Sequence, residues 1–187
     1  LITPHRYTPQ YDQSEKTGIY CVQFVYFRNN QQGRKVLTWW RKACLEWCYN
    51  RFEDGRFGDQ KYLDDWPERF EGVHVLQHLG GGVAPWNMQQ YRFEQQGKEI
   101  IGIELETEKQ FPLVFYHFHS LVFVTPFYFS PRPYYKRNDS TIILLFNPYV
   151  KEIVKLRKQY ALGKMEHYLS GWKFFKYLAE VFVRRGF

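Results

Sequence analysis

Cysteine is scarce in this sequence, and its placement excludes several kinds of protein. Three cysteines stand among 187 residues, which is too few and too odd a number for a disulfide framework. No Cys-x-x-Cys pair and no Cys/His spacing of the zinc-finger kind occurs, so we expect no structural zinc. Cys44 and Cys48 lie four apart in a helical pattern, which predicts two small core residues on one face. Free thiols suit a reducing compartment and predict a cytoplasmic protein.

Long apolar runs are also missing. No stretch is long enough to span a bilayer, and no signal-peptide pattern is present. The net charge of +7 is unevenly placed, because the last forty residues hold nine Lys or Arg against three Glu. The rest of the chain is therefore close to neutral, which argues against a general nucleic-acid-binding surface.

Aromatic residues, by contrast, are abundant at 20%, and strand-like segments alternate with helix-like ones. Residues 19–27 (IYCVQFVYF) predict a strand buried on both faces. A helix is predicted from residue 34 to about 52, and a short one over 59–66, which Pro67 stops. The apolar stripe of the longer helix comprises Val36, Leu37, Trp40, Cys44, Trp47 and Cys48.

The second part of the chain continues this alternation. Short strands are predicted at 73–76 and, buried, at 112–118, with a polar hairpin over 91–106 between them. Helices are predicted from 147 to about 160, capped by its first residue, and over 170–185. Strands alternating with helices place the chain in the α/β class.

Two clusters of residues have the composition of a ligand site, and each follows glycines that are expected to end a helix or a strand. Asp59 and Gln60 stand at an expected helix start, where backbone N–H groups orient a carboxylate. An N-cap Asp beside an exposed Gln explains the same spacing. The segment 79–87 (LGGGVAPWN) combines three glycines with Trp86 and Asn87. It predicts either close approach of backbone to a ligand or a plain flexible turn.

A third cluster, residues 117–120 (HFHS), ends a predicted strand. Imidazoles at the end of a strand in an α/β sheet are well placed for a ligand crevice. A histidine that merely packs in the core is the common alternative.

The order of these clusters resembles the carboxyl-terminal half of nucleotide-diphospho-sugar transferases, in particular glycosyltransferase family 8-like enzymes of bacterial surface-polysaccharide assembly. The matching stretches are TPHRYTP, GIYCVQFVYFRN, LTWWRKACLEWC, EDGRFGDQKYLDDWPERFEGVHVLQHLGGGVAPWN and PLVFYHFHS. They fall within residues 1–120, and DGRFGDQKYLDDWP is the most specific part. The resemblance implies an incomplete GT-A-like mixed sheet flanked by helices. Residues 1–125 would form its acceptor-side part, and 126–187 an irregular segment followed by basic helices.

The resemblance also implies roles for individual residues. Asp59 and Gln60 match a catalytic pair that lies near the anomeric carbon in the family. The residues expected to contact substrate are Gly81, Gly82, Trp86, Asn87 and His119. His117 matches a histidine that completes a divalent-metal site for Mn or Mg in the family, and His119 is an alternative holder of that position.

The other metal ligands of the family form an Asp-x-Asp motif, which this chain lacks. We therefore expect them upstream of Leu1, and we expect the chain alone to be inactive. The implied reaction transfers a hexose from a nucleotide-sugar donor to a saccharide or lipid-linked acceptor.

Two other kinds of protein fit parts of the sequence. A non-catalytic saccharide- or membrane-docking module would use the aromatic surplus and residues 170–187, whose apolar stripe lies beside basic residues suited to an anionic membrane surface. A glycoside hydrolase would need two carboxylates across a cleft. Asp59, Glu104 and Glu106 are available for that role, but no motif supports them.

Overall fold

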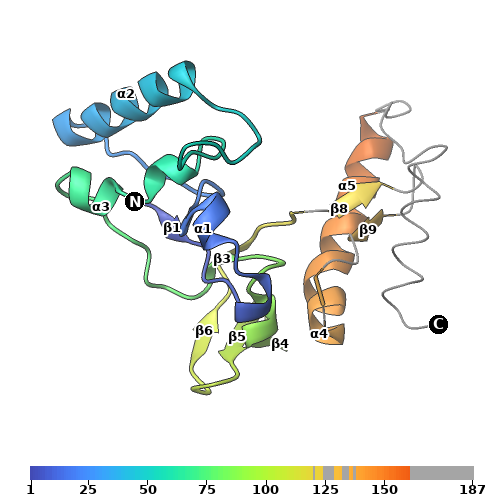
Figure 1. Cartoon of the computed structure of the whole chain (residues 1–187). Coiled ribbons are helices and arrows are strands. Elements are labelled where there is room, and N and C mark those ends of the chain that lie inside the picture. Colours follow the sequence, from blue (N-terminus) through green and yellow to red (C-terminus); the bar gives the residue numbers. More distant parts are fainter. Residues whose placement is uncertain (120, 124–128, 132–134, 137, 161–187) are drawn as a thin grey trace. The chain divides into compact units, whose positions relative to one another are not determined.

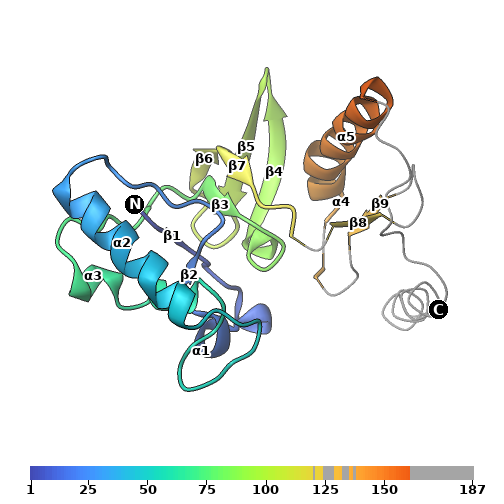
Figure 2. The same cartoon turned by 90° about the horizontal axis from the view of Figure 1, so that it is seen from above.

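The computed structural model describes residues 1–119, 121–123, 129–131, 135–136 and 138–160 (Figures 1 and 2). Small sheets and helices make up this part of the chain, which confirms the α/β class.

The chain divides into two compact units. The first holds Leu1–Asn87 and Phe111–His117, and the second holds Met88–Gln110 and the described residues from Phe118 onward. Of the predicted site residues, only His119 belongs to the second unit.

The strands of the first unit are short. β1 (Thr3–Pro4) pairs antiparallel with β2 (Tyr20–Cys21), and β3 (Gly81–Val83) pairs parallel with β7 (Phe115–Tyr116). The predicted strand over 73–76 is reduced to one isolated parallel bridge, between Val75 and Ile2, which lies just before β1. Because parallel strands end at the same edge of a sheet, the residues that follow β3 and β7 come together.

The predicted strand over 19–27 is mostly wrong, because only Tyr20 and Cys21 pair as a strand. The Thr3 hydroxyl donates to the carbonyl oxygens of Cys21 (3.0 Å) and Phe24 (3.2 Å), and these bonds hold a turn after Cys21. As a result Phe24 and Tyr26 are about half exposed instead of buried. The second predicted buried strand, 112–118, is likewise reduced to β7, since Val114 is largely exposed.

The predicted long helix is confirmed as α2 (Gln31–Glu46), although it begins before residue 34 and ends well before residue 52. Asn30 caps it, because its side chain accepts a hydrogen bond from the backbone N–H of Gly33 at 2.9 Å. Trp47 leaves the helix in an extended conformation, with φ −157° and ψ 124°.

Short helical segments complete the first unit. They are η1 (Pro9–Tyr11), α1 (Ser14–Thr17), η2 (Lys61–Leu63) and α3 (Trp66–Arg69). The helix predicted over 59–66 is thus a single 3-10 turn, η2. Pro67 does not stop it but lies in the first turn of α3, where the missing N–H has no helical partner to lose.

The core of the first unit lies between α2, η2 and α3. Its buried members are Ile2, Val36, Leu63, Trp66 and Phe70. The ring of Trp66 has aromatic neighbours in Phe27 and Trp40, at centroid distances of 5.9 and 5.5 Å. Leu37 and Cys48, predicted in the apolar stripe of α2, are exposed. The buried face therefore passes through Val36, Trp39 and Trp40, and Leu37 lies outside this arc.

The second unit contains the predicted hairpin, which is confirmed. Its strands β4 (Tyr91–Gln96) and β5 (Glu99–Glu104) pair antiparallel, and Gly97 lies in the turn. The other elements from residue 88 onward are η3 (Met88–Gln90), β6 (Gln110–Pro112), β8 (Leu121–Phe123), β9 (Phe129–Pro131), α4 (Asp139–Thr141), the π-helical η4 (Ile142–Phe146) and α5 (Asn147–Gln159). Of the residues of β6, Gln110 belongs to the second unit, and Phe111 and Pro112 belong to the first.

The helix predicted from residue 147 is confirmed as α5, but Asn147 does not cap it. The backbone is already helical through η4, so α5 continues an existing helix and Phe146 precedes it without a side-chain cap. None of the helices in the described part of the chain has both the length and the apolar character to cross a bilayer. The predicted boundary at residue 125 and the predicted helix over 170–185 lie outside the described residues.

A substitution at Gly33 tests the packing at the start of α2. Alanine at an ordinary helix position stabilises by about 1 kcal/mol relative to glycine. Here a Cβ on residue 33 would lie 2.0 Å from the carbonyl oxygen of Arg28. We therefore expect Gly33→Ala to lower the free energy of unfolding by at least about 1 kcal/mol, measured by urea denaturation with circular dichroism. Thr38→Ala, on the exposed face of the same helix, is the control and should be neutral or slightly stabilising. A Gly33→Ala protein as stable as the wild type would contradict this packing.

Candidate functional site

Three chain segments converge where short strands of the first unit end. Trp86 follows β3, His117 follows β7, and His5 follows β1. The backbone N–H of His117 donates to the carbonyl oxygen of Val83 at 2.8 Å, which joins the two parallel strands at this edge. The Trp86 ring lies edge-on to both imidazoles, with centroid distances of 5.2 Å to His5 and 5.4 Å to His117.

Asn87 ties these segments together through its side-chain amide. Its Nδ2 donates to the carbonyl oxygens of His5 (2.7 Å) and Gly82 (3.0 Å). Its Oδ1 accepts from the backbone N–H of Ala84 at 2.9 Å. Asn87 is only 1% exposed, so these bonds satisfy backbone groups that water does not reach. The predicted contact of Asn87 with substrate stays a prediction beside this structural role.

Trp86 is bound to the same loop after β1. Its Nε1 donates to the carbonyl oxygen of His5 at 3.0 Å, and its own carbonyl oxygen accepts from both the N–H and the hydroxyl of Thr8. The ring of Tyr7 stacks on His5 at a centroid distance of 4.5 Å. Two polar aromatic residues of the loop, His5 and Tyr7, are therefore held against a buried indole.

The predicted ligand-binding glycines pack against the protein. Gly82 has φ +103°, a conformation that favours glycine, and a Cβ there would lie 2.8 Å from Nε2 of Gln23. The carbonyl oxygen of Gly81 accepts from the Arg6 guanidinium at 3.0 Å. The same guanidinium also donates to Leu76. In this part of the chain the glycines allow loop-to-loop packing, and their contact with a ligand stays a prediction.

Gln60 joins the cluster indirectly. Its Nε2 donates to the carbonyl oxygen of Thr17 at 2.9 Å, and the Thr17 hydroxyl lies 2.8 Å from the Tyr7 hydroxyl. Since Tyr7 stacks on His5, Gln60 is linked by two hydrogen bonds and one ring contact to the group around Trp86.

Asp59 faces a different set of side chains. Its carbonyl oxygen accepts from Nε1 of Trp40 at 2.9 Å. Its carboxylate lies near two thiols. Burial raises the pKa of Cys21 to about 11, and the Asp59 charge adds to that rise. Asp59 and Gln60 are adjacent in sequence, but among the described residues only Gln60 is linked to the cluster after β1.

Three members of this cluster were not predicted as site residues, namely His5, Tyr7 and Thr17. The available signal was the stretch TPHRYTP, in which three large polar side chains stand between two prolines. His5 is 2% exposed, and its Nδ1 has no hydrogen-bond partner in the part of the chain that the structure describes. His119, which was predicted, is exposed and lies in the second unit.

The residues present fit only part of a metal site. His117 supplies one half-buried imidazole at the end of β7. Among the described residues no group of three or more His, Cys, Asp or Glu side chains could hold a metal ion. A divalent cation bound by His117 therefore stays a prediction that depends on further ligands.

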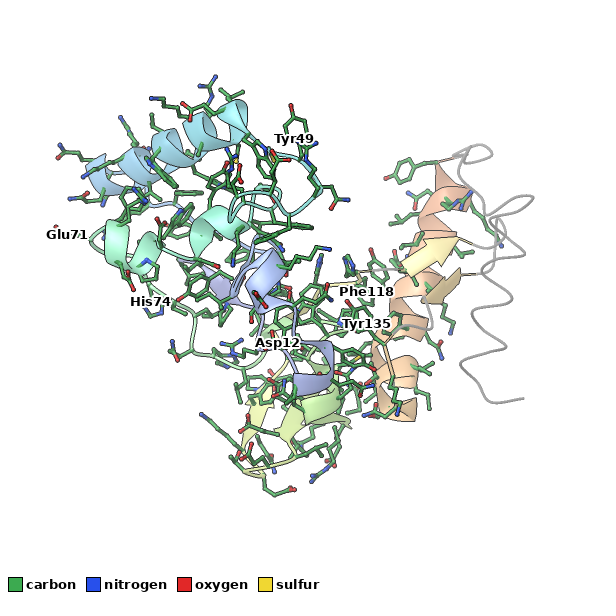
Figure 3. All side chains as sticks on the ribbon, viewed as in Figure 1. Asp12, Tyr49, Glu71, His74, Phe118 and Tyr135 are labelled. Carbon is green, nitrogen blue, oxygen red and sulfur yellow. The ribbon has the colours of Figure 1, made fainter. Side chains whose placement is uncertain are left out.

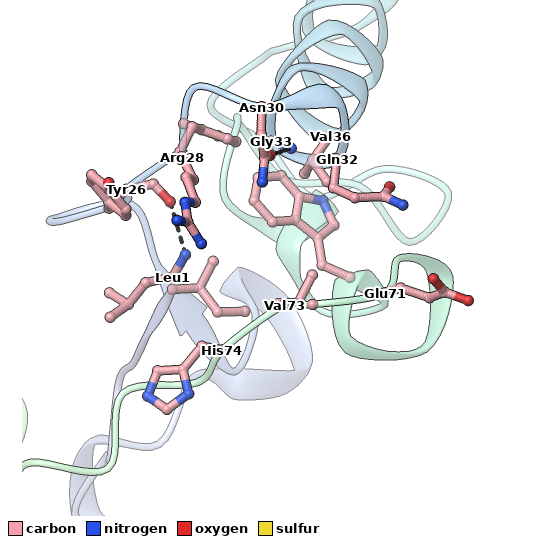
Figure 4. A pocket seen from close by; sticks show the side chains of 14 residues that line it. Leu1, Tyr26, Arg28, Asn30, Gln32, Gly33, Val36, Glu71, Val73 and His74 are labelled. Carbon is pink, nitrogen blue, oxygen red and sulfur yellow. Dashed lines mark hydrogen bonds between the residues drawn. The ribbon is translucent and has the colours of Figure 1, made fainter.

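A cavity of about 450 Å³ lies at the opposite end of β1 (Figure 4). Leu1, whose amino group donates to the carbonyl oxygen of Tyr26 at 2.8 Å, forms part of its wall. Arg28, Glu71 and His74 also line it, and Figure 4 shows Arg28 beside Leu1. None of the predicted site residues lines this cavity, so it is distinct from the cluster at the carboxyl ends of the strands.

Comparison with known proteins identifies relatives of undescribed activity. The chain is 33% identical over 153 residues to the uncharacterized protein YfnD of Bacillus subtilis (strain 168), which covers 80% of the chain and 47% of YfnD. It is 34% identical over 119 residues to the uncharacterized protein YfnF of the same organism, covering 63% of the chain and 38% of YfnF. The chain thus spans about half, or less, of these relatives. No known family model and no solved structure matches it.

The amide of Asn87 gives the first prediction for this site. Asn87→Ala leaves the buried N–H of Ala84 without its partner and removes one of two hydrogen bonds at each of the carbonyl oxygens of His5 and Gly82. We therefore expect a loss of about 3 kcal/mol in the free energy of unfolding. Urea denaturation measures it. Asn50→Ala removes the same side chain from an exposed position and should change stability by less than about 0.5 kcal/mol. Equal stabilities for the two variants would show that the Asn87 bonds contribute little.

The second prediction concerns pH. Burial lowers the pKa of His5 to about 4, nearby His117 adds to this, and carbonyl groups of Gly18 and Ile19 act in the opposite sense. In the unfolded chain His5 has its ordinary pKa of about 6.5. Between these values the unfolded state binds more protons, so stability falls as the pH is lowered through this window. The loss from His5 should reach about 2–3 kcal/mol near pH 4.5.

Urea denaturation at about pH 7 and about pH 4.5 measures this loss in the wild type and in His5→Gln. The variant should lack that part of the acid sensitivity, even where its stability at neutral pH is lower. His74→Gln removes an exposed imidazole and should keep the wild-type difference between the two pH values. An unchanged difference in His5→Gln would mean that His5 does not titrate as a buried neutral group.

Proposed function

We propose that this chain is the acceptor-side portion of a metal-dependent glycosyltransferase with a GT-A-like fold. The proposed reaction moves a hexose from a nucleotide-sugar donor to a saccharide or lipid-linked acceptor in surface-polysaccharide assembly. The proposed location is the cytoplasm, with peripheral attachment at the inner face of the membrane.

One observation carries the proposal. Side chains from three sequence segments that the resemblance treats as one site, around residues 60, 86–87 and 117, are linked by contacts within the first unit to a fourth segment, residues 5–7. They gather at the ends of β1, β3 and β7, the edge at which α/β sheets bind ligands. These segments are spread over more than one hundred residues of sequence.

The roles follow from exposure and chemistry. Gln60, which is partly exposed, presents a carboxamide that can stabilise the positive charge that develops on the sugar ring during transfer. Its bond to Thr17 fixes the amide in place before reaction. Tyr7, partly exposed beside Thr17, offers a hydroxyl and a ring face for a sugar. Trp86 and Asn87 hold the loop that carries Tyr7. Asp59 would act beside Gln60 as a carboxylate.

His117 would hold one coordination position of a divalent metal as a neutral imidazole. A bound cation would offset the negative charge that grows on the departing nucleoside diphosphate. The proposed second group of ligands belongs to residues upstream of Leu1.

A docking module that binds saccharide or an anionic membrane without catalysis is the alternative. Residues 170–187, on which membrane attachment would depend, lie outside the described residues. The two proposals differ in outcome, because a docking module would bind ligand but give no turnover.

The test uses the complete gene product with Mn²⁺ and a panel of nucleoside-diphosphate hexoses, with release of nucleoside diphosphate as the readout. Turnover of at least one donor is expected, and Gln60→Ala should lower kcat by about 100-fold or more. Gln95→Ala, an exposed carboxamide at the hairpin of the second unit, is the matched control and should leave kcat unchanged. The 187-residue chain alone is expected to give no turnover. Absence of both hydrolysis and transfer by the complete protein with every donor would overturn the proposal.

A further inference from the structure

The cavity beside the start of α2 has the size and the lining of a small-molecule site (Figure 4). Its volume is about 450 Å³, and ligand sites in proteins occupy roughly 300–1,000 Å³. Its apolar wall includes Ile2, Phe27, Val36, Trp66 and Val73, which come from separate parts of the sequence. Ile2, Val36 and Trp66 are also buried members of the core of the first unit. The wall is therefore part of a packed scaffold, and the cavity is formed before any ligand enters.

Two features of the cavity favour a ligand with negative charge. Arg28 is exposed, and its guanidinium has no hydrogen bond or ion pair to the described residues. The first turn of α2, a helix of sixteen residues, forms another part of the wall through Gln32 and Gly33. The first N–H groups of a helix carry a partial positive charge, which adds to that of the guanidinium.

Trp66 contributes a buried donor to the same wall. The residue is 2% exposed, and its Nε1 has no hydrogen-bond partner in the part of the chain that the structure describes. A buried N–H without a partner costs free energy. A ligand that brings an oxygen acceptor to the indole removes this cost, whereas a wholly apolar ligand does not.

The acidic and neutral polar residues of the lining leave this preference in place. Glu71 and His74 lie on the segment that follows α3, where Figure 3 labels them. Glu71 is the only acid among the residues that line the cavity, and Figure 4 shows its carboxylate turned away from Arg28 and Leu1. His74 is an imidazole that can donate or accept and so favours neither charge. The end of the cavity at Arg28 is therefore positive.

We propose that this cavity binds a small organic anion, with its carboxylate or phosphate beside Arg28 and the start of α2 and its apolar body against Ile2, Val36 and Trp66. The residues of the cluster at the ends of β1, β3 and β7 do not line the cavity. This binding site is therefore distinct from the one proposed for glycosyl transfer and does not rest on it.

The experiment measures the binding of four probes by isothermal titration calorimetry, both to this chain and to the complete gene product. Phenylacetate and phenyl phosphate each join an apolar ring to an anionic group. Phenylacetamide keeps the ring without the charge, and inorganic phosphate keeps the charge without the ring. We expect each ring-bearing anion to bind at least about tenfold more tightly than phenylacetamide and inorganic phosphate. The tighter of the two anions shows whether the site prefers a carboxylate or a phosphate.

Two matched variants test the position of the anion. Arg28→Gln should weaken the binding of both ring-bearing anions by about tenfold or more and leave phenylacetamide unchanged. Arg41→Gln removes an exposed arginine of α2 that does not line the cavity, so it should leave the affinity for every probe unchanged. The indole N–H signal of Trp66 in a nuclear magnetic resonance spectrum should shift when either anion is added.

Several results would overturn the proposal. Neither anion might be bound at millimolar concentration, or inorganic phosphate might bind as tightly as phenyl phosphate, which would show that the apolar wall is not used. Equal losses in the two arginine variants would reduce the effect to a general attraction between an anion and a basic helix. Binding to this chain but not to the complete gene product would show that another part of the protein fills the cavity. The comparison of probes on the wild type decides the proposal even where a variant does not fold.

Discussion

The arrangement of the first unit depends on a buried carboxamide. Asn87 contributes one side chain to three separate backbone groups, at His5, Gly82 and Ala84. A neighbouring strand could bond to these three backbone groups only by running alongside them. The short turn between β3 and η3 leaves no room for such a strand. An amide side chain offers two donors and an acceptor in a fixed plane, so it can replace that missing strand. The loop after β1 is thereby fixed to the loop after β3, and the neighbouring Trp86 adds a second bond to the same His5 carbonyl oxygen.

This dependence follows from the shortness of the strands. β1, β2 and β7 have two residues each and β3 has three, so few ladder hydrogen bonds are available. Side chains make up the difference. The Thr3 hydroxyl donates to the carbonyl oxygens of Cys21 and Phe24, on either side of the turn after β2. The Arg6 guanidinium donates to the carbonyl oxygen of Gly81 in β3. Each such bond contributes about 1 kcal/mol, but losing one partner of a buried pair costs more than that. A sheet built in this way tolerates few substitutions at its polar positions.

The dependence of the short strands on side-chain hydrogen bonds also explains which parts of the fold the sequence predicts. α2 and the hairpin of β4 and β5 have long, regular patterns, and both are confirmed. The strand over 19–27 is apolar and rich in β-branched residues, yet Thr3, eighteen residues before Cys21, ends it by bonding to its carbonyl groups. The hydrophobic periodicity of a segment does not predict a hydrogen bond from a side chain eighteen residues away. The sequence likewise predicts a helix stop at Pro67, although a proline fits the first turn of a following helix equally well.

The candidate site shows a similar limit. Trp86, Asn87 and His117 do come together because they follow the paired parallel strands β3 and β7, of which the sequence predicts only the second. The resemblance pairs Asp59 with Gln60, but among the described residues only the Gln60 side chain is linked, through Thr17 and Tyr7, to the cluster around Trp86. The stretch TPHRYTP draws attention to His5 as a polar residue between two prolines, but nothing in this pattern predicts that the structure buries it.

Exposure then divides the cluster into two kinds of residue. Trp86 and Asn87 are 5% and 1% exposed and are bound to backbone, so a ligand could touch them only after those bonds open. Gln60, Tyr7 and His117 are partly exposed, and they are the groups that a ligand at this edge meets first. Under the proposed function, substitution of Trp86 or Asn87 should therefore act through stability, and substitution of Gln60, Tyr7 or His117 through ligand contact, since the buried pair holds the exposed residues in position. Comparing ligand binding between variants of the two sets that are equally stable separates the structural role of a residue from its contact with a ligand.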